Sequence, residues 1–330
     1  MASSASSIAV LAELAGSLAH QFQTSELMGA AFGYASIMTS KSDAAKNAWL
    51  VFGLSGPLGQ AFTLAMDDAD PHVIGVSRAV RPALPGVSWR QGSLAEFIDP
   101  AEPLAAIASL GPLDDFARWF ERSALAPARI VAIGSTSVHG KKASPDPAER
   151  ALARALGDAE RALAAAADAR GCALTLLRPT LMYGNGRDRT LSRLVALARR
   201  WRLLPLPVRA GGLRQPVHVE DVAAAVLAAL RADAARPGIF DLPGGETLPF
   251  DEMVRRSLAV GAPGARLIRL PGPVFRAGVG LLRALGRLGG AGSGVMARLD
   301  QDLVYDPAPA RTALGQAPRG FAPSDTAFPP

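Results

Sequence analysis

Cysteine, histidine and lysine are scarce in this sequence, and each shortage excludes a class of site. A single cysteine, Cys172, in 330 residues excludes an internal disulfide framework and a thiolate metal cluster. Cys172 opens an apolar run, so we expect it to be buried and inert. The four histidines lie far apart in the sequence, without the spacing of metal ligands, and we predict no metal site. Only four of the 35 cationic residues are lysines and no dense basic run occurs, which argues against nucleic-acid binding.

Long apolar runs are also missing. No stretch of about 18 uncharged apolar residues occurs, so no membrane-spanning segment is predicted. Residues 1–45 are rich in serine and alanine and contain no cationic residue before Lys41. Glu13 interrupts the apolar centre that a secretory signal needs, and the positive start of such a signal is absent. We expect residues 1–45 to be a poorly ordered extension or the product of an upstream start codon, and the protein to be cytoplasmic.

Apolar residues, by contrast, are plentiful enough for a sizeable core. The chain is 49% hydrophobic and 19% charged, which suits one or two compact units. The formal net charge of +6 reflects 35 Lys and Arg residues against 29 Asp and Glu residues, and most of the cations are arginines. Such an excess fits small ligands that carry phosphate.

The most informative stretch is a change from strand to helix near residue 55. An apolar run at residues 48–52 ends in glycines at 53, 56 and 59, and residues 58–66 then have helical apolar spacing. Side chains at these positions would block the turn, hold a diphosphate off the backbone and prevent close helix packing, respectively. An incidental glycine-rich loop is the alternative. The flanking strand and helix favour a dinucleotide-binding unit with the contacts Gly53, Ser55, Gly56, Pro57, Leu58 and Gly59.

The end of the next predicted strand bears on cofactor choice. An acidic residue there would bind the adenosine ribose hydroxyl of NAD, whereas Ser77 followed by Arg78 suits the 2′-phosphate of NADP. We therefore favour NADP over NAD; the alternative is that Arg78 is an ordinary surface residue. The ends of two further predicted strands add the cofactor contacts Ser93, Leu94, Leu110 and Gly111.

Strands and helices alternate along the first half of the chain. This predicts an α/β fold with a doubly wound parallel sheet of the Rossmann type. We assign residues 46–185 to an NAD(P)-binding Rossmann domain and residues 186–330 to a smaller C-terminal α+β substrate-binding cap, with residues 214–245 partly returning to the sheet. Asp146, Pro147 and Glu149 form a helix start signal. The helix is expected to reach about residue 169, with four residues inward: Leu152, Leu156, Ala159 and Leu163.

Hydroxyl-bearing residues follow the predicted strand at 130–133. Ser135, Thr136 and Ser137 come at its carboxyl end, where side chains of a parallel sheet point into the ligand crevice. The predicted strand at 173–177 leads to Pro179 and Thr180, which we add to the cofactor contacts.

Residues 273–288 carry arginines at 276, 283 and 287, on one helical face. A basic amphipathic helix of this kind is able to lie on an acidic membrane surface. Packing against the cap is the commoner arrangement, and we favour it. Equal flotation with liposomes by the intact protein and by a variant without this segment would exclude membrane contact.

Taken together, these motifs resemble the extended short-chain dehydrogenase/reductase superfamily, in particular the NAD-dependent epimerase/dehydratase family that acts on nucleotide sugars. The resemblance covers roughly residues 48–325. It rests on the glycine motif, on residues 135–140 (STSVHG), on Arg178-Pro179 with Tyr183-Gly184, and on residues 214–221 (RQPVHVED). It implies that Arg214 binds the nucleotide diphosphate and that Ser135 hydrogen-bonds the reacting sugar oxygen. Arg187 and His218 are the other expected substrate contacts.

The resemblance fails at the catalytic pair. The family uses a Tyr with a Lys four residues later, where the Lys lowers the Tyr pKa and anchors the nicotinamide ribose. The matching positions here hold Leu152 and Leu156, and each of the chain's three tyrosines lacks a Lys four residues later. Lys141 and Tyr183 are candidate replacements; the alternative for Lys141 is a solvated loop charge. This hypothesis predicts that Lys141→Ala or Tyr183→Phe lowers turnover without changing NADP affinity.

Two functions therefore remain open. The first is an NAD(P)-dependent epimerase/dehydratase or reductase acting on a nucleotide sugar or a similar polar metabolite, with non-standard catalytic residues and a possible homodimeric state. The second is a non-catalytic NADP-binding pseudoenzyme with a regulatory or assembly role. The chain resembles atypical members of the superfamily, which include complex I subunit-like proteins and unassigned sugar-nucleotide epimerase homologues.

Overall fold

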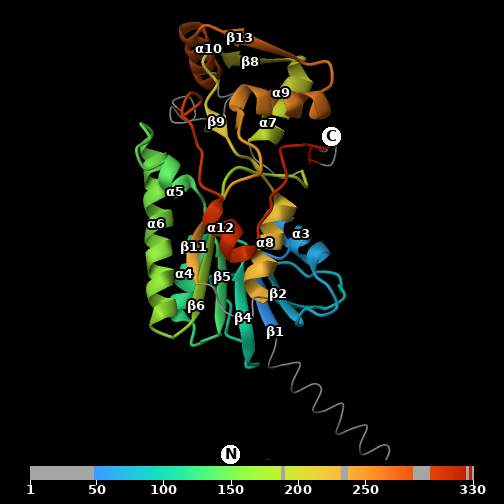
Figure 1. The fold of residues 1–330 in the computed structure, drawn as a ribbon, viewed down its shortest axis with the longest axis vertical. Coiled ribbons are helices and arrows are strands. Elements are labelled where there is room, and N and C mark those ends of the chain that lie inside the picture. Colours follow the sequence, from blue (N-terminus) through green and yellow to red (C-terminus); the bar gives the residue numbers. More distant parts are fainter. Residues whose placement is uncertain (1–47, 187–189, 232–236, 285–297, 325–326, 329–330) are drawn as a thin grey trace, which may run out of the picture.

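The computed structural model describes residues 48–186, 190–231, 237–284, 298–324 and 327–328. Residues 1–45, Arg187 and Arg287 lie outside these ranges, so the predictions made for them are not addressed by the structure. In Figure 1 a sheet flanked by helices occupies one end of the longest axis, and the cap occupies the other.

A seven-stranded sheet forms the larger part, in the order β3-β2-β1-β4-β5-β6-β11. Every neighbouring pair of strands in it is parallel. This arrangement confirms the predicted doubly wound α/β fold. The strands are β1 (Ala48–Phe52), β2 (Val73–Ser77), β3 (Val87–Gln91), β4 (Leu104–Ser109), β5 (Arg129–Ile133), β6 (Ala173–Pro179) and β11 (Gly238–Leu242).

Helices cover both faces of this sheet, as the apolar runs of its central strands require. On one face, α3 (Pro57–Ala65) and α8 (Val219–Arg231) pack against each other and share a core with alternate residues of β1. On the other face, α4 (Leu113–Arg122) and α6 (Pro147–Asp168) enclose an aromatic core around Phe52 and Trp119, whose ring centroids lie 4.5 Å apart. Cys172 is buried on this face as a free thiol.

Helix α6 begins where its start signal predicts. The Asp146 side chain accepts a hydrogen bond of 2.9 Å from the Ala148 amide, and Pro147 occupies the first turn. The prediction for its buried face was partly wrong. Ala159 and Leu163 are buried, but Leu152 is 44% exposed and Leu156 is only half-buried. The helix packs on the sheet through smaller residues, so both leucines are left toward solvent.

In the part of the cap that the structure describes there are short strands and three helices. Its elements are β7 (Met182–Tyr183), α7 (Leu191–Trp201), β8 (Leu203–Pro207), β9 (Leu213–Arg214), β10 (Val217–His218), β12 (Leu248–Pro249), α9 (Phe250–Gly261), β13 (Arg266–Leu270) and α10 (Gly272–Ala284). Strands β8 and β13 pair in parallel, as do β7 and β10, whereas β9 and β12 pair in antiparallel fashion. An apolar core around Tyr183, Met253 and Phe321 joins α7 and α9 to the C-terminal end.

The chain then leaves the cap and returns to the sheet. Residues 298–307, which we name the return segment, lead to α12 (Ala308–Leu314), a helix that packs against β11 and α8 (Figure 1). The short helix α5 (Ser137–Gly140) lies beside this path, since Leu303 and Tyr305 come within 3.3 Å of where a side chain on Gly140 would be. The C-terminal part of the chain therefore contacts both the sheet and the cap.

Candidate functional site

The glycine corner after β1 has the geometry that its sequence predicts. Gly53 has a φ of +81°, and a Cβ there would lie 3.0 Å from the main chain of Leu110 and Gly111. A Cβ on Gly59 would lie 2.1 Å from the Leu54 carbonyl oxygen, so only glycine lets α3 approach the loop this closely. The corner is thus held tightly against the end of β4 and against its own loop.

The N-terminus of α3 is open to an anion. Gly56 is its N-cap residue and provides no side-chain cap, Pro57 follows at the first turn, and no acidic residue lies in that turn. Backbone N–H groups at such a terminus attract negative charge. Ser55, Gly56 and Pro57 are partly exposed, whereas Leu58 is buried in the core. A diphosphate would therefore meet the backbone of the loop, with Leu58 contributing packing.

Strand β2 ends in a cluster of one serine and two arginines. Ser77 is buried, and its hydroxyl oxygen accepts hydrogen bonds from the Ala79 amide, at 3.3 Å, and from Arg81 Nε, at 3.1 Å. Arg78 and Arg81 are both exposed. Arg81 was not predicted as a cofactor contact, although its position three residues after Arg78 is visible in the sequence.

The remaining predicted cofactor contacts lie near the ends of strands β3 to β6. The Leu110 amide donates to the Phe52 carbonyl at 2.9 Å, which places Gly111 beside the glycine corner. The Ser93 carbonyl accepts from the amides of Glu96 and Phe97, and Leu94 packs partly into the core. The Pro179 carbonyl accepts a 3.3 Å hydrogen bond from Thr136 Oγ1, and the Thr180 hydroxyl donates to the Gln215 carbonyl.

Helix α6 lacks the tyrosine and lysine that the family uses for proton exchange. Leu152 and Leu156 occupy the positions of the absent Tyr and Lys, and neither side chain exchanges protons. Ser135 follows β5, and its hydroxyl accepts a hydrogen bond from the Ser137 amide at 3.1 Å. Lys141 follows α5 and is half-buried; burial, together with the nearby Arg298 cation, lowers the pKa of its ammonium group.

Tyr183 serves the packing of the cap. Its side chain is 1% exposed, and its hydroxyl donates to the Gly320 carbonyl at 3.2 Å and accepts from the Ala322 amide at 3.4 Å. Burial raises the pKa of Tyr183. A catalytic role for Tyr183 stays a prediction, and it requires the C-terminal residues to leave this hydroxyl.

A different tyrosine lies at the end of β5. The Tyr305 hydroxyl donates to the Thr136 carbonyl at 3.3 Å, one residue from Ser135, and its ring centroid lies 6.0 Å from that of His139. Its backbone amide donates to Gln215 Oε1 at 2.7 Å, and burial raises the pKa of its phenol. No local sequence signal identifies Tyr305, because the return segment brings it to the site from a distant part of the chain.

Arg214 anchors the return segment. Its Nη1 donates to the carbonyls of Leu213 and Gln301, at 2.8 and 2.6 Å, and its Nη2 donates to the Arg298 carbonyl. The guanidinium is buried and also lies 5.6 Å from the Phe250 ring centroid. Binding of a diphosphate by Arg214 remains a prediction, and the diphosphate would have to share or replace these carbonyl contacts.

His218 is mostly enclosed by the cap. Its Nδ1 accepts from the Glu220 amide at 3.3 Å, and its ring meets the edge of Tyr183 at 5.0 Å. Burial, reinforced by the Arg319 cation, lowers the pKa of His218, so the ring is neutral at pH 7. A neutral ring with Nδ1 accepting leaves Nε2–H as its donor. Contact with substrate by His218 is likewise still a prediction.

Two largely buried ion pairs position the elements around the site. Arg178 forms a two-bonded pair with Glu160 of α6 and lies 3.0 Å from His139 Nε2. Arg298 pairs with Glu149 in the first turn of α6, and Ser144 Oγ donates to the same carboxylate at 2.6 Å. Glu149 was predicted as part of the helix start; it also ties the return segment to the Rossmann part.

Within the described ranges, no group of three or more His, Cys, Asp or Glu side chains is arranged to hold a metal ion.

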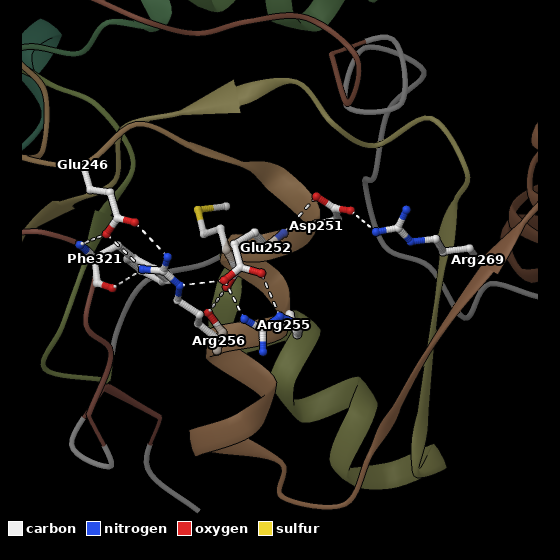
Figure 2. Close-up of polar contacts among 9 residues, drawn as sticks. Glu246, Asp251, Glu252, Arg255, Arg256, Arg269 and Phe321 are labelled. Atoms are coloured by element: carbon white, nitrogen blue, oxygen red, sulfur yellow. Dashed lines mark hydrogen bonds and ion pairs between the residues drawn. The ribbon is translucent and has the colours of Figure 1, made fainter.

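A surface network on α9 fixes the C-terminal residues to the cap (Figure 2). Glu246 accepts from Arg256 and, at 3.0 Å, from the Phe321 amide, while Arg256 Nη1 donates to the Phe321 carbonyl at 3.1 Å. Hydrogen bonds from Arg255 and Arg256 lower the pKa of Glu252 to about 2. Phe321 in turn packs on Tyr183, with ring centroids 4.8 Å apart. This network therefore supports the wall of the cap next to the site.

Comparison with known proteins agrees with this geometry. Residues 115–242 match the model of the NAD dependent epimerase/dehydratase family. The matched region is 128 of the 330 residues, and over it the chain is similar to this family. The match confirms the family predicted from the sequence motifs and includes Ser135, Leu152, Arg178 and Arg214.

Several solved structures share the fold. MoeE5, solved with UDP-glucuronic acid and NAD, superposes with a TM-score of 0.63 at 18% identity, over 83% of this chain and 94% of that one. UDP-glucuronic acid 4-epimerase from Bacillus cereus, solved with NAD, gives a TM-score of 0.61 at 14% identity, over 85% and 95% of the two chains. TunA, an NAD dependent NDP-hexosamine 5,6-dehydratase, gives 0.58 at 16% identity, over 83% and 93%.

One curated relative is similar over a shorter region. Subunit 9 of the mitochondrial NADH dehydrogenase 1 alpha subcomplex from Arabidopsis thaliana is 34% identical over 104 residues. This region is 31% of the present chain and 26% of the relative, so about a quarter of the relative's length is matched.

Proposed function

We propose that the chain is an NADP(H)-dependent oxidoreductase of the epimerase/dehydratase type that acts on a nucleotide sugar. The single observation that carries this proposal is the open glycine corner at the edge of the sheet where Ser135 also lies. UDP-glucuronic acid and NAD are named with the structures of similar fold, and these names supply the substrate class.

The residues of the corner fit a pyridine dinucleotide. The positive φ of Gly53 and the uncapped N-terminus of α3 leave backbone N–H groups facing the space in front of the loop. The two exposed arginines after Ser77 fit a 2′-phosphate, which is why we propose NADP rather than NAD. When bound, the nicotinamide would accept or deliver hydride.

Two hydroxyl groups of this chain are assigned to the reacting sugar oxygen. Ser135 would hydrogen-bond that oxygen, and Tyr305 would exchange a proton with it in place of the absent tyrosine. Burial raises the pKa of Tyr305, so its phenol is protonated at neutral pH and acts as a proton donor. Lys141 lies close by and would stabilise negative charge developing on the substrate.

Turnover by the purified chain tests the proposal. The protein is incubated with NADP or NADPH and with UDP-glucose or UDP-glucuronic acid, while nicotinamide absorbance and sugar products are followed. We expect conversion of at least one sugar nucleotide, dependent on the dinucleotide. Cofactor binding without conversion of any sugar nucleotide in a wider panel would contradict the enzymatic proposal.

The second candidate is a non-catalytic NADP-binding protein with an assembly role. Two leucines on the open face of α6, in place of the proton-exchanging pair, favour it. Its other support is similarity to a protein named as a subunit of a larger dehydrogenase. Cofactor binding without turnover is the result that this candidate predicts.

A further inference from the structure

The end of the cap farthest from the sheet has an unusual charge composition. In Figure 1, α10, β13 and β8 lie at the top, and α9 and α7 lie below them. The acidic residues Asp251 and Glu252 are in the first turn of α9. Residues 191–213 and 262–284, which we name the arginine end, contain no Asp or Glu and hold nine arginines: Arg193, Arg199, Arg200, Arg202, Arg209, Arg266, Arg269, Arg276 and Arg283. The whole chain has 35 cationic and 29 acidic residues, so this end departs strongly from the average.

Most of these cations face solvent. Exposed arginines come from α7, β13 and α10 and from the residues on either side of β8, and include Arg200, Arg202, Arg209, Arg266 and Arg276. Arg269 is paired with Asp251 of α9 (Figure 2), and Arg199 donates to the Gly261 and Phe328 carbonyls. The exposed arginines therefore give this end a positive field over several elements.

Apolar side chains lie among the arginines and are exposed as well. They are Leu203 at 37%, Val208 at 56%, Ile268 at 40%, Val274 at 56% and Leu281 at 62%. On α10, residues 274, 277, 278 and 281 follow helical i, i+3, i+4, i+7 spacing and are all exposed and apolar or small. Helix α10 packs on β8, the arrangement favoured from the sequence, and its apolar stripe stays exposed. Arg276, two residues after Val274, lies on a different face of the helix.

We propose that the arginine end binds the surface of an anionic phospholipid membrane. Helices that lie in the membrane interface combine an exposed apolar stripe with flanking arginines, and the arginines are attracted to anionic headgroups. In the described part of the chain no helix has the length and apolar character needed to cross a bilayer, so the contact is peripheral. The exposed apolar residues here are aliphatic, which favours lipid over nucleic acid, because nucleic-acid surfaces use aromatic rings to stack bases.

Vesicle co-sedimentation of the full-length chain tests this assignment. The probes are vesicles of phosphatidylcholine alone and of phosphatidylcholine mixed with phosphatidylserine. We expect binding to the mixed vesicles only, weakened by salt. The triple variant Arg202→Gln/Arg266→Gln/Arg276→Gln is expected to bind at least tenfold more weakly, since each arginine near the surface contributes about fivefold.

A matched control removes three exposed arginines elsewhere. Arg154→Gln/Arg161→Gln/Arg311→Gln lowers the net charge equally, but on α6 and α12. The control is expected to bind like the natural chain, and circular dichroism checks that both variants fold. Equal weakening in both triple variants, or no binding of the natural chain to mixed vesicles, would overturn the proposal. The proposal would also be overturned if the natural chain bound single-stranded DNA more tightly than the mixed vesicles and only the first triple variant lost that binding.

Discussion

At the scale of single residues, two leucines and a distant tyrosine decide which side chains near the end of β5 are able to exchange a proton with a substrate. Leu152 and Leu156 remove the proton-exchanging pair from α6, while the Tyr305 phenol lies on the Thr136 carbonyl at the end of β5. In the proposed function, the Tyr305 phenol takes the role of the tyrosine that is absent from α6. This comparison makes Tyr305 the first residue to test.

We expect Tyr305→Phe to lower turnover about 10²–10⁴-fold, the usual contribution of general acid–base catalysis, with little change in NADPH affinity. Tyr183→Phe removes a hydroxyl bonded to Gly320 and Ala322, so its main effect is expected on the thermal stability of the cap. Initial rates and thermal melts of both variants separate the two roles. Unchanged turnover in Tyr305→Phe, with loss in Tyr183→Phe, would reverse the assignment.

Some residues of the site were predictable from sequence because their signals are local. The positive φ of Gly53 and the tight packing of Gly59 follow from a turn between adjacent elements. Tyr305 was not predictable, because its contact with Thr136 spans 169 residues. The hydrogen bonds from Arg214 to carbonyls of the return segment were not predictable either, because they also join distant parts of the chain. The other predicted site residues remain to be tested by substitution.

At the scale of elements, α9 and α6 act as anchors for the end of the chain. Helix α6 binds Arg298 through Glu149, and α9 binds Phe321 through Arg256 with the help of Glu246 (Figure 2). The start of α6 was predictable from its capping residues. The exposed face of α6 was not predictable from the sequence, because packing against α4 and β6 determines which side of the helix is buried. Helix α12 was missed, since a short alanine-rich segment near three prolines gives little periodic signal.

The pKa of Glu246 is lowered by its hydrogen bond from Arg256, so this contact stabilises the fold above the ordinary Glu pKa near 4.5 and is lost as pH falls below it. We expect Glu246→Gln to speed hydrogen exchange of the Phe321 amide at pH 7. In the natural chain, protection of that amide is expected to fall as pH drops below about 4.5. Mass spectrometry of exchanged peptides measures both effects.

Asp251→Asn is the matched control for this experiment. It removes a carboxylate from the same helix, but that carboxylate pairs with Arg269 and does not contact residue 321. Exchange at Phe321 is expected to stay unchanged in Asp251→Asn. Equal acceleration in both variants would show that the ion pair between Glu246 and Arg256 does not hold the C-terminal residues.

At the scale of the whole molecule, the proposed functions lie at separate places. The dinucleotide corner and the two hydroxyl groups lie at the edge of the sheet, and the arginine end lies at the far end of the cap (Figure 1). Alternation of strands and helices was enough to predict a doubly wound parallel sheet, but not that β11 completes it as a seventh strand. The clustering of arginines was only partly visible in sequence, at residues 276, 283 and 287. Its extent depends on the pairing of β8 with β13, which unites two segments about 60 residues apart.

Isothermal titration of the purified full-length chain with NADPH and with NADH is the most direct test of the dinucleotide corner, on which the proposed function depends. We predict saturable binding of NADPH, about tenfold or more tighter than that of NADH, because charged hydrogen bonds from Arg78 and Arg81 would reach the 2′-phosphate. Absence of binding heat for both dinucleotides at about millimolar concentration would contradict the account.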